Sequence, residues 1–303
     1  MKHAIVTGAN GFIGSNVTRY LLLKGIEVTA IVHHSTERID SLKAQFDDNL
    51  RILVCDMENI ASLPELLEGK AYDVFYHFAW NGSAGALRAD YIIQSKNAIA
   101  SAEAVKTAKL LGCRRFVSVG TITEHIADDL LARHYTSENL IYGLSKDYAH
   151  KLVDITAHKE KIPYVWGVLS NIYGGDNETG NLISYTLNQF KCGKKPTYGP
   201  CLQPYNFTHI DDVVESLFLL GEADNLKKEE YLISNGECRQ LREYLEELAS
   251  ICGKEVAIGE RSDDGVRYDE SWFSDNELHM ELGFSPKYDF LNGIHKLMSE
   301  MEN

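Results

Sequence analysis

Tyr142 and Lys146 are the residues of this sequence whose types and spacing are best suited to chemistry. They stand four positions apart in the segment Tyr-Gly-Leu-Ser-Lys, so a helix would direct both side chains to the same side. A free phenol titrates near pH ~10, and a neighbouring ammonium favours the phenolate, which suits proton exchange nearer neutral pH. Because the chain contains 16 tyrosines, roughly one Tyr-x-x-x-Lys pair is expected by chance. The assignment of a catalytic role therefore also depends on where the pair lies among the predicted strands and helices.

A third group should hydrogen-bond the reacting oxygen where charge develops. The segment 116–121 (Phe-Val-Ser-Val-Gly-Thr) predicts a strand that ends in hydroxyl side chains. We expect Thr121 to take this role. Ser118 and Thr123 are alternatives, and Ser118 fits an ordinary strand hydroxyl better. The predicted catalytic set is therefore Thr121, Tyr142 and Lys146, acting on a carbonyl or an alcohol.

A glycine-rich loop follows the first apolar run of the chain. The segment 7–14 (Thr-Gly-Ala-Asn-Gly-Phe-Ile-Gly) lies between a predicted strand and a predicted helix, which is the context that a dinucleotide-binding loop requires. Its glycines permit the tight turn, the close approach of a pyrophosphate and close packing of the helix on the strand. Cofactor contacts are expected at Gly8, Asn10, Gly11, Phe12, Ile13 and Gly14.

The end of the second predicted strand bears on the choice of cofactor. An unmodified adenosine ribose is usually bound there by an acidic residue, whereas this sequence has imidazoles, a hydroxyl and a guanidinium. These groups suit a 2′-phosphate, so the sequence favours NADP and leaves NAD possible, with Glu37 or Asp40 then reaching the ribose. The expected contacts are His33, His34, Ser35 and Arg38.

The elements that would position these residues alternate along the first half of the chain. Short β-rich runs at 3–7, 27–32, 51–55, 74–78, 115–119 and 164–169 alternate with helical patterns at 12–24, 90–111 and 141–159. Such alternation predicts a doubly wound parallel sheet of the Rossmann type, with helices on both faces. Gly25 is a plausible end for the first helix.

The pattern changes after about residue 170. We expect a dinucleotide-binding domain at 1–170, to which segments near 205–235 return, and a smaller α/β substrate-binding lobe mainly from 171–303. Further helices are predicted at 237–252 and near 291–301, separated by a turn at 283–286.

Composition excludes several classes of protein. The 303-residue chain has a formal net charge of −14, which disfavours a nucleic-acid partner. Its six cysteines form no Cys-x-x-Cys pair, so no metal or redox site is predicted. No apolar run reaches the length of a membrane span and the N-terminus lacks a signal-peptide core, so a cytoplasmic protein is expected.

These motifs together resemble the extended short-chain dehydrogenase/reductase superfamily, in its nucleotide-sugar epimerase, dehydratase and 4-ketoreductase branch. The resemblance runs nearly end to end. It includes His77-Phe78-Ala79, Asn171-Ile-Tyr-Gly, the segment 205–213 and Leu282-Gly-Phe-Ser-Pro. It implies that Asp56 contacts adenine and that Asn171 helps to bind a sugar nucleotide. Further cofactor contacts are expected at Met57, Phe78, Ala79 and Trp80, besides Tyr142 and Lys146.

Departures from the family pattern narrow the reaction. The 4,6-dehydratases have Asp-Glu directly after the catalytic threonine, whereas Ile122 and Thr123 follow Thr121 here, so dehydration is disfavoured. The cysteine that some relatives use as a base for inversion at C3 or C5 is also missing at this point. Two further departures change the usual nucleotide contacts. Val168 stands where many relatives have an arginine before Asn-x-Tyr-Gly, and Tyr205-Asn206 replaces Arg-Asp.

The sequence favours NADPH-dependent reduction of the 4-keto group of a nucleotide-linked deoxysugar, with Tyr142 as proton donor. The first alternative is an NAD-dependent 4-epimerase. Reduction of a free small ketone and a non-catalytic dinucleotide sensor are further alternatives, and the intact Tyr142–Lys146 pair disfavours the last.

Substrate contacts are expected from loops at the carboxyl ends of the strands, where ligands bind to open α/β sheets. The candidates are Trp80, Asn81, Thr123, Glu124, His125, Asn171 and Tyr205. For Trp80 and His125, simple packing and solvent exposure are equally good explanations. The resemblance also implies a homodimer formed through the helices predicted at 90–111 and 141–159.

Overall fold

The computed structural model of the protein describes residues 1–34, 36–67, 69–135, 137–138, 140–175, 181–263 and 268–302. The chain forms two compact units. The first consists of Met1–Val168 and Val214–Tyr231, and the second of Leu169–Val213 and Leu232–Asn303.

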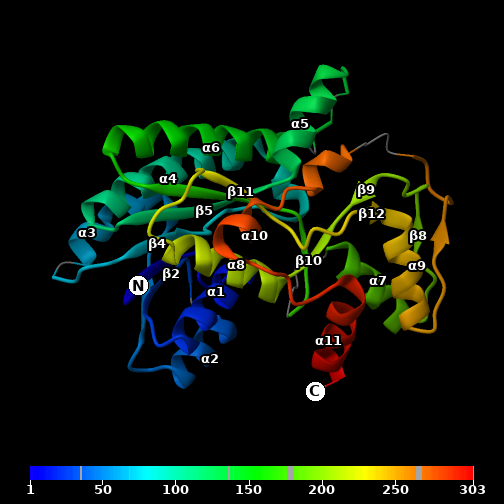
Figure 1. Cartoon of the computed structure of the whole chain (residues 1–303), viewed down its shortest axis with the longest axis horizontal. Helices are drawn as coiled ribbons and strands as arrows, with labels where there is room; N and C mark the ends of the chain where they lie inside the picture. Colours follow the sequence, from blue (N-terminus) through cyan, green and yellow to red (C-terminus); the bar gives the residue numbers. More distant parts are fainter. Residues whose placement is uncertain are drawn as a thin grey trace. The chain divides into compact units, whose positions relative to one another are not determined.

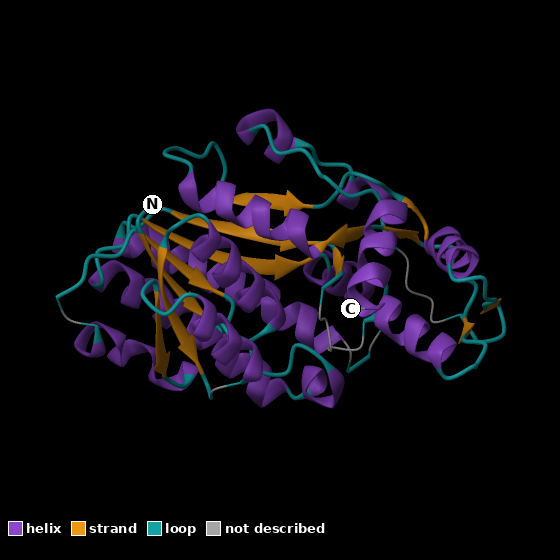
Figure 2. Ribbon diagram, turned by 90° about the horizontal axis from the view of Figure 1, so that it is seen from below, coloured by secondary structure: helices purple, strands orange, loops and turns teal. Residues whose placement is uncertain are grey.

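The first unit is built on a seven-stranded sheet with the order β3-β2-β1-β4-β5-β6-β11. Strand β1 pairs in parallel with β2 and β4, β2 with β3, and β4 with β5. The strands fan out as a twisted sheet in Figure 2. Their bounds are β1 His3–Thr7, β2 Glu27–Val32, β3 Leu50–Val54, β4 Val74–His77, β5 Arg115–Thr121, β6 Tyr164–Leu169 and β11 Glu230–Ile233.

Helices cover both faces of this sheet, as predicted. α4 (Tyr91–Leu110) and α6 (Leu140–Glu160) lie on one face, and α1 (Phe12–Leu23), α2 (Glu37–Gln45) and α8 (Ile210–Glu222) on the other (Figure 1). α1 ends before Gly25, whose φ of 75° is left-handed, as expected for a helix end. Shorter elements connect these helices, namely η1 Met57–Ser62, α3 Leu63–Leu66, η2 Gly85–Ala89 and α5 Thr123–Ala132.

The sheet order reverses between β1 and β4, because the chain builds β2 and β3 on one side of β1 and then crosses to β4 on its other side. The point at which the strand order reverses is where open α/β sheets bind their ligands, beyond the carboxyl ends of the strands. The predicted glycine loop follows β1, and residues 78–82 follow β4.

The second unit is smaller and contains three two-stranded pairings, β10-β7, β12-β9 and β13-β8. Its core is aromatic, with the Phe207 and Tyr244 rings 5.2 Å apart and the Tyr244 and Phe290 rings 4.8 Å apart. Its elements are β7 Asn171–Tyr173, α7 Leu182–Lys191, β8 Thr197–Tyr198, β9 Pro204–Tyr205, β10 Phe207–His209, β12 Arg239–Gln240, α9 Leu241–Ile251, β13 Ala257–Ile258, η3 Glu270–Phe273, α10 Glu277–Leu282 and α11 Phe290–Glu302.

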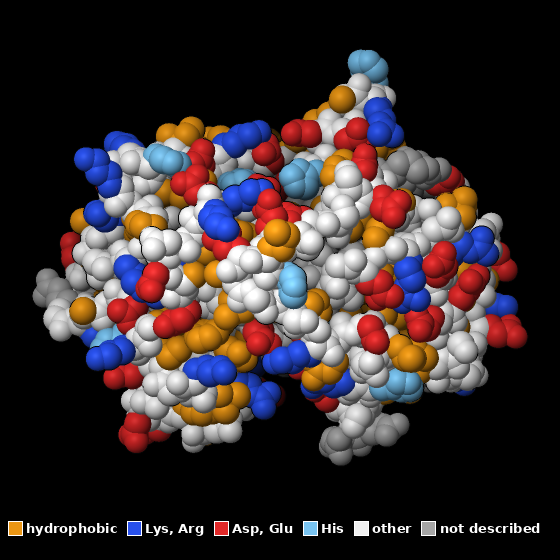
Figure 3. Space-filling view, viewed as in Figure 1, with side chains coloured by type: hydrophobic (Ala, Val, Ile, Leu, Met, Phe, Trp, Pro, Cys, Tyr) orange, Lys and Arg blue, Asp and Glu red, His pale blue; other side chains and the backbone are white. Residues whose placement is uncertain are grey.

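One predicted element begins at the wrong residue. The helix expected at 237–252 begins at Leu241, because Arg239 and Gln240 form β12 and pair antiparallel with Tyr205 and Pro204 of β9. Acidic and basic side chains are interspersed over the face of the molecule in Figure 3. Among the described helices, none is both long and apolar enough to cross a membrane.

Candidate functional site

The glycine loop brings the carboxyl ends of β1 and β4 into direct contact. Gly8 has a φ of 65°, and a Cβ added there would lie 2.7 Å from the Ala79 backbone nitrogen. Gly11 is the N-cap of α1 and provides no side-chain cap, so the amides of the first turn, at Phe12 and Ile13, can bind an anion. The arrangement fits the pyrophosphate of a dinucleotide. Asn10 donates its Nδ2 to the His34 carbonyl at 2.9 Å and thereby ties the loop to the end of β2.

The predicted ribose-binding residues follow β2. His33 is 70% exposed and its Nδ1 pairs with the carboxylate of Asp56, the residue expected to contact adenine. Arg38 is half-buried in the first turn of α2. The buried Thr36 hydroxyl at the N-cap of the same helix has no hydrogen-bond partner among the described residues. Ser35 lies outside the described residues, and Met57 opens η1 and is half-buried.

A buried polar network fixes the end of β4. The Thr7 hydroxyl lies 2.9 Å from His77 Nδ1, and Ser118 donates its hydroxyl to the His77 carbonyl at 3.0 Å. Burial lowers the pKa of His77 to about 3, so its ring is neutral. Ser118 is thus committed to the core, which leaves Thr121 and Thr123 as hydroxyls at the end of β5. Phe78 and Ala79, which follow His77, are half-buried.

Trp80 lies beside the predicted catalytic pair. Its Nε1 donates to Gln94 Oε1 at 2.8 Å, and its ring packs edge-on against Tyr142 with the centroids 6.1 Å apart. The Lys146 ammonium lies 3.8 Å from the centroid of the Trp80 ring, a cation–π contact. The neighbouring Asn81 side chain is exposed, and its backbone amide is held by Asn97 of α4.

Tyr142 and Lys146 both come from the first two turns of α6. Lys146 is buried and donates its Nζ to the Val119 carbonyl of β5 at 3.0 Å. The Arg88 guanidinium lies 3.9 Å from the centroid of the Tyr142 ring. Burial raises the pKa of Tyr142 to about 12, whereas the charge of Arg88 lowers it. Arg88 is thus a cation that favours the phenolate, which the sequence analysis missed.

Close packing joins α6 to the end of β5. A Cβ added to Gly143, next to Tyr142, would lie 2.4 Å from the Thr123 carbonyl oxygen. The Thr121 and Thr123 hydroxyls share a hydrogen bond at 2.7 Å. The structure therefore brings the predicted catalytic residues of β5 and α6 together with Trp80. Their roles remain predictions.

Glu124 and His125 lie in the first turn of α5 and not in a loop. Glu124 is 5% exposed, and its Oε1 accepts a hydrogen bond from the Thr121 amide at 2.7 Å. The sequence analysis expected Glu124 to contact the sugar, but its carboxylate is directed into the interior of the first unit. His125 is exposed, as the alternative explanation for it expected.

Two predicted substrate contacts belong to the second unit and lie close to each other. The Tyr205 hydroxyl donates to Asn171 Oδ1 at 2.8 Å, and Asn171 Nδ2 donates to the Asn206 carbonyl at 3.1 Å. The amide of Asn171 thus has a fixed orientation within its unit.

Several residues that build the site carry no motif in the sequence. Gln94 and Asn97 of α4 hold the loop after β4 through its backbone, and Trp166 of β6 donates to Glu124 at 3.3 Å. Gln94 and Asn97 carry the only amide side chains among the buried residues described for α4, and this was the signal that could have found them. Arg88 gave no such signal.

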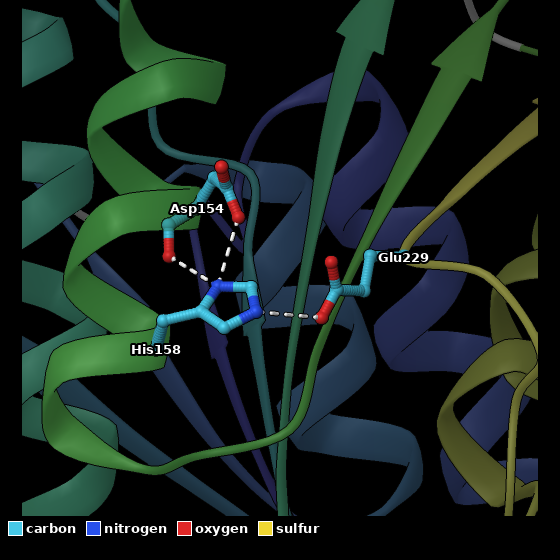
Figure 4. A group of neighbouring side chains, drawn as sticks. All are labelled: Asp154, His158 and Glu229. Atoms are coloured by element: carbon cyan, nitrogen blue, oxygen red, sulfur yellow. Dashed lines mark hydrogen bonds and ion pairs between the residues drawn. The ribbon is translucent and has the colours of Figure 1, made fainter.

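A second polar cluster lies on the surface near the other end of α6 and consists of Asp154, His158 and Glu229 (Figure 4). His158 Nδ1 is 2.9 Å from the Asp154 carboxylate, and its Nε2 is 3.3 Å from the Glu229 carboxylate. His158 Nδ1 also lies 3.0 Å from the Asp154 backbone carbonyl, and this hydrogen bond, together with the Glu229 and Asp154 carboxylates, raises the pKa of His158. The cluster fits an ion-pair network between α6 and the segment before β11.

Replacing His158 with Ala should lower stability only where the ring is charged. Because the pKa is raised in the folded state, the stabilisation is complete below the ordinary histidine pKa of about 6.5 and is lost as the pH rises through the raised value. We expect the thermal midpoint to fall by about 1–2 °C at pH 5.5 and to match the native protein at pH 9. Calorimetry at both pH values tests this, and an equal loss at both would contradict it.

With this geometry in place, comparison with known proteins defines the class. Residues 4–234 match the NAD dependent epimerase/dehydratase family, and the chain belongs to this family. It is an enzyme family of the extended short-chain dehydrogenase/reductase type, as the motifs predicted.

Individual relatives are distant. CDP-abequose synthase of Salmonella typhimurium is 25% identical over 316 residues, covering 99% of this chain and 98% of the relative. A trifunctional UDP-glucose 4,6-dehydratase/UDP-4-keto-6-deoxy-D-glucose 3,5-epimerase/UDP-4-keto-L-rhamnose-reductase of Arabidopsis thaliana is 22% identical over 98% of this chain, which spans 46% of that protein. The structure of UDP-glucuronic acid 4-epimerase from Bacillus cereus, in complex with UDP-glucuronic acid and NAD, shares the fold with a TM-score of 0.77, 21% identity and coverage of 100% and 99% of the two chains.

Proposed function

We propose that the protein reduces the 4-keto group of a nucleotide-linked deoxysugar with NADPH. The observation that carries this proposal is the environment of Thr121. The hydroxyl of Thr121 shares a hydrogen bond with the hydroxyl of Thr123. The nearest acidic side chain that follows in the sequence is Glu124, which is buried and accepts a hydrogen bond from the Thr121 backbone amide. Within the described segment 121–125, no carboxylate is placed to eliminate water from the sugar, so the Tyr142–Lys146 pair is left to exchange a proton with a ketone.

The residues of the first unit divide the work of this reduction. The bound nicotinamide supplies the hydride. Tyr142 donates its phenolic proton to the substrate oxygen, and the Thr121 hydroxyl donates a hydrogen bond to the same oxygen as charge develops. The Arg88 guanidinium, 3.9 Å from the centroid of the Tyr142 ring, stabilises the phenolate that remains. We assign a supporting role to Lys146, which lies one helical turn from Tyr142 on α6. Trp80 holds the lysine in place through its ring face.

Two relatives support the proposal by name. One is a synthase of a CDP-linked sugar and matches this chain over nearly its whole length, and the other includes a reductase of a 4-keto nucleotide sugar. The second candidate, a 4-epimerase that retains NAD, is favoured by the neighbour that binds NAD and UDP-glucuronic acid.

The test begins with the cofactor. Nucleotide that co-purifies should be released and identified by mass, and apo protein titrated with NADPH and NADH. Oxidation of added NADPH on mixing with CDP- or dTDP-linked 4-keto-6-deoxysugars is the expected result. Tightly retained NAD, with interconversion of C4 epimers and no net oxidation of NADPH, would replace the reductase by the epimerase.

Replacing Arg38 with Ala should weaken NADPH by about tenfold or more and leave NADH within about twofold, because only NADPH has the 2′-phosphate that a guanidinium can pair with. The Thr36 hydroxyl, which has no hydrogen-bond partner among the residues that the structure describes, supports a phosphate at this end of α2. Arg51→Ala, on the exposed side of the adjoining strand β3, is the matched control. Fluorescence titration measures both affinities, and equal losses for the two cofactors would reject the 2′-phosphate site.

We also propose that the chain forms a homodimer through α4 and α6. Both helices expose large apolar side chains to solvent, at 55% for Ile99, 65% for Ile155 and 48% for Tyr148. Burial of such groups against a second copy is favourable, and light scattering would measure the state directly.

A further inference from the structure

Glu124 is a buried carboxylate for which the proposed reaction has no use. It lies on α5, one turn beyond the Thr121 that ends β5, and only 5% of it is exposed. A buried carboxylate is costly unless partners stabilise it. Its Oε1 accepts from the Thr121 amide at 2.7 Å, and its Oε2 accepts from Trp166 Nε1 at 3.3 Å.

The absence of a side chain at Gly120 leaves room for the Glu124 carboxylate. A Cβ added to Gly120 would lie 2.3 Å from Glu124 Oε1 and 2.1 Å from Trp166 Nε1, so only glycine fits at the last buried position of β5. The glutamate, the tryptophan and the glycine therefore form one packed unit. This unit holds the backbone from which the Thr121 hydroxyl projects.

The same carboxylate is connected toward solvent by a histidine. His150 of α6 stacks its ring flat on Trp166, with the centroids 4.7 Å apart and the planes 2° from parallel. Its Nδ1 lies 3.8 Å from Glu124 Oε2 and 3.5 Å from Glu230 Oε2. Glu230 opens β11 and its side chain is 46% exposed, so one ring nitrogen stands between an internal carboxylate and one that reaches water.

Glu124 and Lys146 both lie close to Trp166, because the Lys146 ammonium is 5.9 Å from the centroid of the ring whose Nε1 donates to Glu124. Each of the two groups changes the pKa of the other, since the ammonium lowers the pKa of Glu124 and the carboxylate raises that of Lys146. Burial acts in the opposite sense on both and favours their neutral forms. Burial therefore favours transfer of the proton from the ammonium to the carboxylate, and the attraction between the two charges opposes it.

We propose that Glu124 is a positioning residue that fixes Thr121 and passes protons from solvent to Lys146 through Glu230 and His150. This inference rests on the proposed function, because reduction consumes a proton at Tyr142 in every turnover. The phenolate left on Tyr142 takes a proton from the Lys146 ammonium, and the resulting amine takes one from the Glu124 carboxylic acid. His150 Nδ1 receives a proton from Glu230 and gives it to the Glu124 carboxylate, and water restores the proton on Glu230.

The titratable and charged groups around this path come from several elements. They are His77 of β4, Arg88 of η2, His125 of α5, Asp147, Lys151 and Asp154 of α6, and the path residues themselves.

The first test measures the Glu124 carboxyl directly, without substrate. In protein with ¹³C-labelled glutamate, the Glu124 resonance, assigned by its loss in Glu124→Gln, should titrate above the ordinary glutamate range. In Lys146→Met it should titrate at still higher pH, because the cation that favours the carboxylate is gone. Titration at the ordinary value, or no response to Lys146→Met, would overturn the proposal.

The second test measures turnover. Glu124→Gln can still accept the Thr121 amide bond but carries no exchangeable charge, so kcat should fall by about tenfold or more with KM within about twofold. The basic limb of its pH profile should move to lower pH, because Lys146 loses a neighbouring anion. A profile parallel to that of the native protein would show a merely structural residue and reject the proposal.

His150→Ala separates proton passage from packing. Its kcat should fall and should be partly restored by imidazole in solution, whereas His158→Ala, two turns further along the same face of α6, should keep native activity with or without imidazole. An absence of rescue would remove His150 from the path. If none of the 4-keto nucleotide sugars causes the native protein to oxidise NADPH, the proposed function fails. The carboxyl titration still decides whether Glu124 is paired with Lys146.

Discussion

Replacing Tyr142 with Phe should lower turnover by about 10²–10⁴-fold while NADPH affinity stays within about twofold, because the substitution removes the acidic proton and little else. The ring keeps its contacts with Trp80 and with the Arg88 guanidinium, which require only an aromatic face. The measurement is single-turnover oxidation of NADPH, together with a separate titration of the cofactor.

Tyr148→Phe is the matched control. Tyr148 lies on the same helix, is 48% exposed and makes none of these contacts, so its loss of a hydroxyl should leave the rate unchanged. Near-native turnover in Tyr142→Phe would reject Tyr142 as the proton donor. A matching loss of turnover and cofactor affinity would instead indicate damage to the fold.

Replacing Gly14 with Ala should destabilise the first unit by about 3 kcal/mol or more and abolish cofactor binding. The new methyl group would lie 2.1 Å from the Gly8 carbonyl oxygen and 2.7 Å from its carbonyl carbon, both backbone atoms that cannot rotate away. Relief requires that α1 move from β1, which would displace the amide groups of its first turn. Chemical denaturation and cofactor titration measure the two effects.

Gly25→Ala distinguishes this effect from a general glycine effect. Gly25 has a φ of 75° with nothing within 4 Å of an added Cβ, so only backbone strain of about 1 kcal/mol is expected. Cofactor affinity should be unchanged there. Normal cofactor binding by Gly14→Ala would show that the helix N-terminus does not hold the pyrophosphate.

The sheet could be predicted from the sequence because its strands are short apolar runs bounded by glycines and polar residues. β1, β2 and β6 have the bounds that their runs predicted, since each strand is buried on both faces and its composition changes abruptly at its ends. β11 was not assigned as a strand, because Glu230–Ile233 is too short to show a pattern of its own.

The candidate site could be predicted only where motifs exist. The glycine loop and the Tyr142–Lys146 pair are local patterns. The structure places the loop directly after β1, and α6, which carries the pair, packs against the end of β5. The burial of Glu124 could not be predicted. It depends on Trp166, which lies 42 positions away along the chain, and on a vacancy that only Gly120 leaves beside it.

The route of the chain through the first unit affects how the protein can be made and divided. The sheet that carries the glycine loop and the Tyr142–Lys146 pair receives its last strand from residues that follow an excursion of more than forty residues into the second unit. During synthesis, one edge of β6 therefore stays unpaired until β11 emerges from the ribosome. All six residues of β6 are buried in the finished protein, so a fragment ended near residue 170 would expose an apolar strand edge prone to pairing with other chains. A boundary that looks natural in the linear sequence thus cuts through a single folding unit.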